Sequence, residues 1–295
     1  MSDIVPVHRR TATGDAWFLY NNSAHPIEGT VTFTTTGAPS AVDLWTGAVT
    51  PLGEYKADAK TVSLPVRIEA EDTTAFLFDR RSAKTMSVVD TNADQVLRVG
   101  KSLVAQDEQG GTRTFTLSDG TKRTVTLPDL PGPAVLYGGW ELSATTTAPT
   151  GTSKTALTLD SLKDWKDIPE LNGKSGAGVY TKSVDLPVSW KGINRGVTLK
   201  LGEFAGAVRV WVNGKAVPVS EVPGTNAVDV TDQLRIGANT VKVELSTTLN
   251  NAMRTTAKAG TPGYSSFASR PELPTGLLGP VELVPYGRAT VTTVK

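Results

Sequence analysis

Short runs of β-branched and aromatic residues recur along the chain, alternate apolar with polar side chains, and are bounded by Gly, Pro, Asn or Asp. Alternation with a period of two places one face of a strand on a core and the other face in water. Such runs predict short strands joined by tight turns. The segment 160–165 is the only candidate helix, of one or two turns, with Asp160 as its N-cap. The sequence therefore predicts an all-β fold of antiparallel β-sandwiches.

The predicted strands fall into separate groups, and 295 residues suffice for two domains that bury their cores without disulfides. Residues 1–82 predict a first sandwich, 83–133 a small β-hairpin unit with a proline-rich linker, and 134–295 a second sandwich. The boundary is expected near Gly132. The expected strands of the two sandwiches are 16–20, 30–34, 41–45, 61–68, 74–78, 179–186, 197–201, 207–212 and 240–245.

Turn chemistry refines this division. Ser118-Asp119-Gly120 predicts the tip of the small hairpin, and Asn213-Gly214 predicts a two-residue turn with positive φ at both positions. The segment 145–154, rich in Ser, Thr and Pro, is expected to be a loop before the strands of the second sandwich resume.

Composition excludes several classes of partner. Thirty basic and 29 acidic residues give a net charge of +1, which predicts no binding to nucleic acid or to anionic lipid. No apolar run reaches the roughly 20 residues of a membrane-spanning helix, so no membrane partner is expected. Residues 1–10 lack the apolar core of a signal peptide. Localisation stays open: a complete chain would be cytoplasmic, whereas a fragment of an exported parent would be secreted.

An ordered series of motifs runs through the second half of the chain and resembles a known family. The motifs are Asp164-Trp165, Ser175-Gly176-Ala177-Gly178, Gly202-Glu203-Phe204-Ala205-Gly206, Trp211-Val212-Asn213-Gly214, Asp229-Val230-Thr231-Asp232, Asn250-Asn251 and Thr275-Gly276-Leu277-Leu278-Gly279-Pro280. Their order resembles the galactose-binding-like jelly roll of glycoside hydrolase family 2, in the variant at the C-terminus of family 106 α-L-rhamnosidases. Upstream, His8-Arg9-Arg10, Trp17 and Leu44-Trp45 look like the sandwich that follows the catalytic barrel in those enzymes.

The resemblance implies a role as well as a fold. In that family the catalytic carboxylates lie on a (β/α)₈ barrel N-terminal to this region, and nothing in this sequence matches the barrel. The expected function is therefore a non-catalytic, carbohydrate-binding accessory region of a rhamnosidase-like glycoside hydrolase. Its expected partner is the catalytic barrel or a rhamnose-containing glycan. One departure weakens glycan binding, because relatives commonly carry an aromatic ring and Pro-Pro in the loop that here reads 221–226.

Sugar binding usually combines an aromatic platform with amide or carboxylate partners for hydroxyls. The candidates of this kind are Trp165, Tyr180, Trp211, Asn250 and Asn251. Alternation along 207–212 places Trp211 on the face opposite Val208, Val210 and Val212. An alternative interpretation is that the Trp211 ring only covers the outer sheet or an interface between the modules.

Metal and histidine chemistry have few residues to draw on. Jelly-roll sugar modules often hold a structural calcium ion, and Asp160, Asp164 and Asp167 form the nearest acidic group, although their spacing matches no EF-hand loop. No other cofactor is expected. His8 and His25 are the two histidines, and a packing or hydrogen-bonding role is expected for His8.

Two other functions stay open. A minimal glycoside hydrolase or lyase would use carboxylates in a cleft between the modules, which need to face each other at roughly 5 Å or 6.5–9.5 Å. Acidic residues such as Glu69, Glu203 and Glu244 are better explained as parts of a solvated face. A pure protein-interaction or assembly module would bind a separate polypeptide that carries the barrel, and no sugar.

Overall fold

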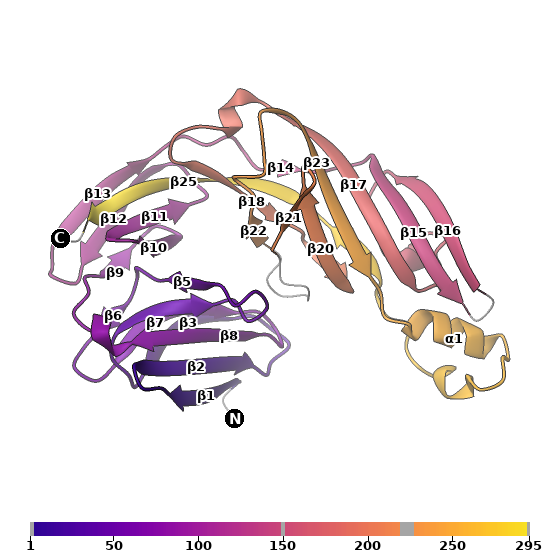
Figure 1. The fold of residues 1–295 in the computed structure, drawn as a ribbon, viewed down its shortest axis with the longest axis horizontal. Helices are drawn as coiled ribbons and strands as arrows, with labels where there is room; N and C mark the ends of the chain where they lie inside the picture. The colour runs from indigo at the N-terminus through magenta and orange to yellow at the C-terminus, as the bar shows by residue number, and fades with distance from the viewer. Residues whose placement is uncertain (1–2, 149–150, 219–226, 294–295) are drawn as a thin grey trace. The chain divides into compact units, whose positions relative to one another are not determined.

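A computed structural model describes residues 3–148, 151–218 and 227–293, and its elements are almost entirely β-strands that pair antiparallel (Figure 1). The predicted all-β sandwich fold is confirmed. None of the helices in these ranges is both long and apolar enough to cross a membrane. Two compact units make up the chain: the first comprises Met1–Leu130, Gly192–Arg195 and Tyr286–Lys295, and the second comprises Pro131–Lys191 and Gly196–Pro285.

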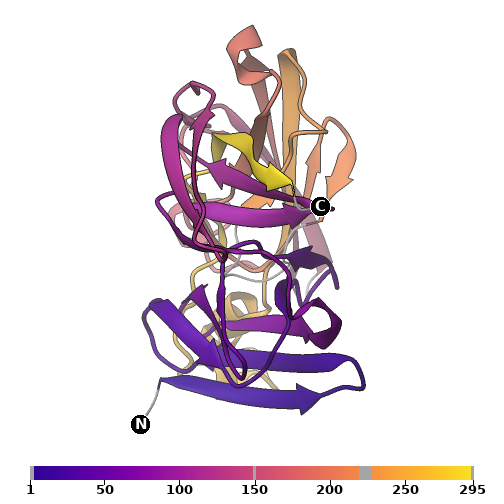
Figure 2. The same cartoon turned by 90° about the vertical axis from the view of Figure 1, so that its left-hand side faces the viewer.

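The first unit begins with a sandwich of two sheets. One sheet has the order β1 (Ile4–Arg10), β2 (Gly14–Asn21), β8 (Thr73–Asp79), β4 (Ala38–Val42) and β5 (Val49–Pro51). The other has the order β3 (Ile27–Phe33), β7 (Val62–Ile68) and β6 (Lys56–Ala57). The indigo strands β1 and β2 run side by side in Figure 1 and in Figure 2.

Alternation of side chains builds the core of this sandwich. On β7, every second residue from Val62 to Ile68 is buried, as the sequence pattern predicts. These side chains meet Phe33, whose ring lies 5.6 Å from Phe76 and 5.0 Å from Phe78 between centroids. Tilted and edge-on aromatic contacts of this kind add to the free energy gained from burying the rings.

A second core in the first unit lies between two smaller groups of strands. One group is β13 (Lys122–Leu127), β12 (Gly111–Leu117) and β9 (Val88–Thr91); the other contains β10 (Gln95–Val99), β11 (Ser102–Asp107) and the end of β25 (Glu282–Thr293). The predicted hairpin is confirmed as β12–β13, with Gly120 at a φ of 84° in its turn. β25 pairs with β11 from Gly287 to Thr293, so the C-terminal strand completes this core. The short helix η1 (Arg80–Ser82) precedes β9.

The second unit is built on a six-stranded sheet. Its order is β16 (Gly151–Leu159), β15 (Trp140–Ala148), β17 (Gly176–Leu186), β23 (Gly237–Ser246), β20 (Ala207–Val212) and β21 (Lys215–Val217). Further pairs join β14 (Ala134–Val135) to β25, β18 (Arg195–Lys200) to β22 (Ala227–Asp229), and β19 (Glu203–Ala205) to β24 (Gly276–Gly279). The remaining elements are η2 (Trp165–Asp167), η3 (Val188–Trp190), α1 (Asn250–Lys258) and η4 (Ser265–Phe267). α1 lies beyond the ends of β15 and β17 (Figure 1).

Local expectations for this unit meet mixed outcomes. Asn213-Gly214 forms the predicted turn between β20 and β21, with φ values of 52° and 78°. The loop expected at 145–154 is wrong, because Thr145 to Ala148 and Gly151 to Lys154 pair as β15 and β16. Threonine is β-branched, and its strand preference outweighs the polar character of the segment. The predicted N-cap at Asp160 is also wrong: Asp164 caps η2.

Candidate functional site

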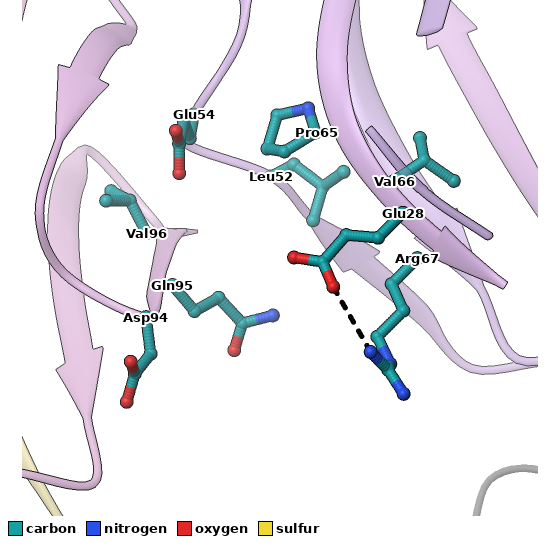
Figure 3. A pocket seen from close by; sticks show the side chains of 9 residues that line it. All are labelled: Glu28, Leu52, Glu54, Pro65, Val66, Arg67, Asp94, Gln95 and Val96. Carbon is teal, nitrogen blue, oxygen red and sulfur yellow. Dashed lines mark hydrogen bonds and ion pairs between the residues drawn. The ribbon is translucent and has the colours of Figure 1, made fainter. Parts of the chain in front are cut away.

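A pocket of about 360 Å³ opens in the first unit between β7 and the start of β10 (Figure 3). The segment 52–55 crosses between the two cores of this unit and holds them together. Gly53 donates its backbone N–H to Val96 at 2.8 Å and accepts one from Val88 at 2.8 Å, while the Tyr55 N–H reaches the Val88 oxygen at 2.9 Å. The lining residues are Glu28, Leu52, Glu54, Pro65, Val66, Arg67, Asp94, Gln95 and Val96.

The pocket has an apolar floor and a polar rim. Val66 and Val96 are buried, and Leu52 is half-buried beside them. Around this floor, the Gln95 amide and the Glu28 carboxylate point toward one another, whereas the Asp94 carboxylate points away (Figure 3). An apolar surface surrounded by a few polar groups is the usual construction of a small-molecule site.

The charged groups of the rim differ in how far they are already engaged. Arg67 donates to Glu28 at 3.1 Å and to Glu69 at 2.8 Å, so this guanidinium is shared between two carboxylates. One oxygen of Asp94 accepts the Glu108 N–H at 2.8 Å. In the described ranges, the side chains of Glu54 and Gln95 have no hydrogen-bond partner. These two groups are therefore open to a ligand.

Electrostatics set Glu54 apart from the other carboxylates of the pocket. Burial raises the pKa of Glu54, the nearby charge of Asp90 raises it further, and Lys56 opposes part of the shift. A half-buried carboxyl group with a raised pKa in a pocket is a recognised mark of a functional site. Glu54 can accept hydrogen bonds when ionised and can donate one when protonated.

The two aromatic candidates Trp165 and Tyr180 lie in the core of the second unit. Their exposed fractions are 1% and 0%, and Trp165 donates its indole N–H to the Tyr180 hydroxyl at 2.6 Å. Gly178 and Gly276 make room for the indole, because a Cβ at either position would lie 2.8 Å or 2.6 Å from it. Both rings serve packing in this structure, and neither presents a face to solvent.

Trp211 lies on β20 and is half-buried. The predicted orientation is confirmed, because its neighbours Val210 and Val212 are buried on the opposite face. The ammonium group of Lys242 lies 3.7 Å from the centre of the Trp211 ring. One face of the indole is therefore occupied by a cation in a favourable cation–π contact.

Asn250 and Asn251 begin α1 and hold the segment that follows it. Asn251, 5% exposed, donates to the Leu273 oxygen at 2.8 Å and accepts the Leu273 N–H at 3.0 Å. Asn250 donates to the Pro271 oxygen at 2.9 Å. Two pairs of the five sugar-binding candidates are joined by hydrogen bonds. Trp165 of η2 bonds to Tyr180 of β17, and Asn250 bonds to Asn251 within α1.

Of the three acidic residues proposed for calcium, Asp164 is already engaged by backbone groups of the protein. Asp164 accepts backbone N–H groups from Lys166 at 3.0 Å and from Thr275 at 3.2 Å. Across the described residues, no group of three or more His, Cys, Asp or Glu side chains could hold a metal ion. The calcium ion stays a prediction. The loop 221–226, in which relatives commonly carry an aromatic ring that this sequence lacks, lies outside the described residues.

His8 has the hydrogen-bonding role expected for it. Its Nε2 lies 2.8 Å from Oδ1 of Asp15, and its ring stacks on Trp17 with 4.2 Å between centroids. Burial raises the pKa of Asp15, but hydrogen bonds from Thr35, His8 and Arg80 outweigh burial and lower that pKa to about 2. His8 is therefore part of a structural cluster around a buried carboxylate.

Sequence reasoning missed Glu54 and Gln95. They lie in separate short segments, and the pocket exists only because backbone hydrogen bonds bring 52–55 onto Val88 and Val96. Its five sugar-binding candidates also left out two exposed aromatic side chains, Trp45 at 58% and Tyr137 at 78% exposure. High exposure of large rings is the signal that a three-dimensional structure supplies and local alternation does not.

Comparison with known proteins gives a likeness of fold. No family model matches the chain, and no curated protein matches it. A rhamnosidase from Novosphingobium sp. PP1Y is similar over 96% of this chain and 24% of its own, with a TM-score of 0.66 and 22% identity. The FMN-binding β-glucuronidase of Facaelibacterium prausnitzii L2-6 has a TM-score of 0.35 and 23% identity, over 52% of this chain and 22% of its own. The Ruminococcus gnavus β-glucuronidase has a TM-score of 0.31 and 17% identity, over 39% of this chain and 21% of its own. The chain thus spans about a quarter of the rhamnosidase, with which it shares its fold.

Proposed function

We propose that this chain is a non-catalytic, carbohydrate-binding accessory region of a rhamnosidase-like glycoside hydrolase, of the family 106 type, and that its first unit holds a sugar. Two features support the proposal. The fold is shared with a rhamnosidase over nearly the whole chain. The observation that carries the proposal is the pocket around Glu54 and Gln95. In the described residues these two side chains have no hydrogen-bond partner, and they lie next to apolar lining residues.

The chemistry of the pocket suits a neutral sugar. A sugar ring has an apolar face formed by its C–H groups, which would pack against half-buried Leu52 and exposed Pro65. Its hydroxyls would donate to the carboxylates and accept from the Gln95 amide. Glu28 pairs with Arg67 at 3.1 Å, but both side chains are exposed, so this ion pair holds the carboxylate only weakly.

Calorimetric titration with rhamnogalacturonan oligosaccharides and with methyl α-L-rhamnopyranoside tests the proposal. The intact chain is expected to bind, and the variants Gln95→Ala and Glu54→Ala are expected to bind at least tenfold more weakly. Glu170→Gln, at an exposed position of the second unit, is the control and should bind as the parent chain does. Absence of heat with every oligosaccharide would overturn carbohydrate binding and leave a role in supporting the barrel.

A second candidate function is favoured by the raised pKa of Glu54. A carboxyl group that stays protonated above its usual range is what a glycosidase needs as general acid. A minimal hydrolase or lyase would use Glu54 with Glu28 or Asp94 as the second carboxylate. Incubation with nitrophenyl rhamnoside and rhamnogalacturonan separates the two functions. Turnover that Glu54→Gln abolishes would establish catalysis and overturn the non-catalytic proposal.

A further inference from the structure

A second, smaller hollow lies in the second unit and is separate from the pocket around Glu54. Its volume is about 170 Å³, less than half that of the first pocket. The lining residues are Val135, Leu136, Tyr137, Gly138, Ser161, Leu162, Leu278, Pro280 and Val281. Tyr137 forms part of this wall, and its side chain is 78% exposed. The hollow therefore combines a largely apolar lining with one open aromatic ring.

The backbone that carries Tyr137 is held at consecutive carbonyl groups. The indole N–H of buried Trp140 donates to the Leu136 oxygen at 2.8 Å. The ammonium group of Lys182 donates to the Tyr137 oxygen at 2.9 Å and also to the Gly138 oxygen. Gly138 and Gly139 turn the chain with φ values of 50° and 59°. Tyr137 is thus an exposed ring on a fixed backbone, which keeps the entropic cost of binding low.

The rest of the hollow provides apolar contact and few hydroxyl groups. Leu162, Leu278 and Pro280 form apolar parts of the lining, and Leu136 is tied to it by its N–H bond to the Val281 oxygen at 2.8 Å. Within the part of the chain that the structure describes, the hydroxyls of Tyr137 and Ser161 have no hydrogen-bond partner. A ligand that fits must have an apolar edge and only a few hydroxyls near it.

We propose that this hollow is a second sugar subsite that takes a single 6-deoxyhexose unit. The apolar face of the sugar ring packs on Tyr137, and the methyl group at C6 lies among Leu162, Leu278 and Pro280. The Tyr137 and Ser161 hydroxyls bind ring hydroxyls. A hexose with a hydroxyl at C6 would bury that group among apolar side chains without a partner, which is unfavourable. The subsite deepens the proposed carbohydrate-binding function and rests on it, but uses different residues.

The test is a titration of the ¹⁵N-labelled full chain followed by nuclear magnetic resonance, because it reports on each pocket separately. Methyl α-L-rhamnopyranoside is the probe, and methyl α-L-mannopyranoside, which adds only the hydroxyl at C6, is its matched comparison. Amide signals of Gly138 and Ser161 are expected to shift with the rhamnoside, with an affinity at least threefold higher than with the mannoside. Equal affinity for both would overturn the assignment of a 6-deoxyhexose.

Variants at exposed positions complete the test without disturbing the fold. The affinity for the rhamnoside, measured from the shifts at Gly138 and Ser161, should fall at least tenfold in Tyr137→Ala. In Tyr137→Phe the same affinity should stay within about threefold of that of the parent chain. Trp45→Ala, which removes an exposed ring from the first unit, is the control and should have no effect. Shifts confined to Gln95 and its neighbours would overturn this subsite and leave the proposed function intact. Shifts confined to the Tyr137 hollow would support the subsite while removing the first pocket, and no shifts anywhere would overturn both.

Discussion

The hydroxyl of Tyr180 accepts the indole N–H of Trp165 at 2.6 Å and the backbone N–H of Leu277 at 3.3 Å. Burial raises the pKa of Tyr180, and these two hydrogen bonds offset only part of that effect. One buried oxygen thus joins η2, β17 and β24. This explains why aromatic residues at 165 and 180 suit the second unit without any contact to a sugar.

Replacing Tyr180 by Phe removes that oxygen and keeps the ring. The Trp165 N–H is then buried without a partner, which typically costs about 1–3 kcal/mol. We expect the Tyr180→Phe variant to unfold at a lower urea concentration, with an unchanged slope of the transition. An unchanged midpoint would mean that water or a rearranged carbonyl replaces the hydroxyl.

Gly276 provides a second test of the packing around Trp165. Its φ is 111°, and an added Cβ would lie 2.6 Å from the Cδ1 atom of Trp165. We expect Gly276→Ala to lower the free energy of unfolding by about 2–4 kcal/mol, because backbone strain and overpacking add. Gly47→Ala is the matched control: its φ is 72°, but nothing lies within 4 Å of the added Cβ. That control should lose only about 1 kcal/mol. Equal losses of stability for Gly276→Ala and Gly47→Ala in thermal unfolding would show that the Trp165 indole moves aside without cost.

Local sequence patterns predicted the strands and turns that neighbouring residues alone determine. The alternation of Val62, Leu64, Val66 and Ile68 identifies β7, and Asn213-Gly214 identifies a turn that few other dipeptides form. Asn239 is buried and bonds to Arg235, Gly237 and Asn213, which gives it a structural role.

Long-range pairing was not predictable in the same way. Residues 102–107 pair with the end of β25, and no short pattern specifies that partner. The candidate pocket depends on such contacts, because Glu28, Glu54 and Gln95 come from three segments. The burial of Trp165, a sugar-binding candidate, was unpredictable for a related reason. This residue lies in a single turn of helix, which is too short for the spacing of apolar residues to indicate whether its ring is buried or exposed.

Acid should weaken the first unit through Asp15. Its pKa of about 2 lies below the ordinary value of 3.8, so its ionised form stabilises the fold above pH 4. That stability, about 1–2 kcal/mol after allowance for screening of exposed Arg10 and Arg80, is lost as pH falls from about 4 to about 2. Asp15→Asn should therefore lower the free energy of unfolding at pH 6 and have little effect near pH 2. Denaturant titrations at several pH values, with exposed Asp232→Asn as control, check this. A loss of the same size at every pH would contradict the role of charge.

Glu54 should have the opposite dependence on pH. Because burial raises its pKa above the ordinary 4.5, the fold favours its neutral form, and the stability that it contributes at low pH is lost as pH rises through the raised pKa. Above the raised pKa, the ionised carboxylate therefore disfavours the folded state. Glu54→Gln keeps the shape and removes the charge, so its melting temperature should exceed that of the parent chain at pH 7, and the difference should shrink below pH 4. Differential scanning calorimetry at both pH values measures this, with Glu170→Gln as control. A variant that is more stable and yet binds sugar more weakly would show that Glu54 is retained for a ligand at the expense of stability, whereas a lower melting temperature at pH 7 would contradict the unfavourable burial of its charge.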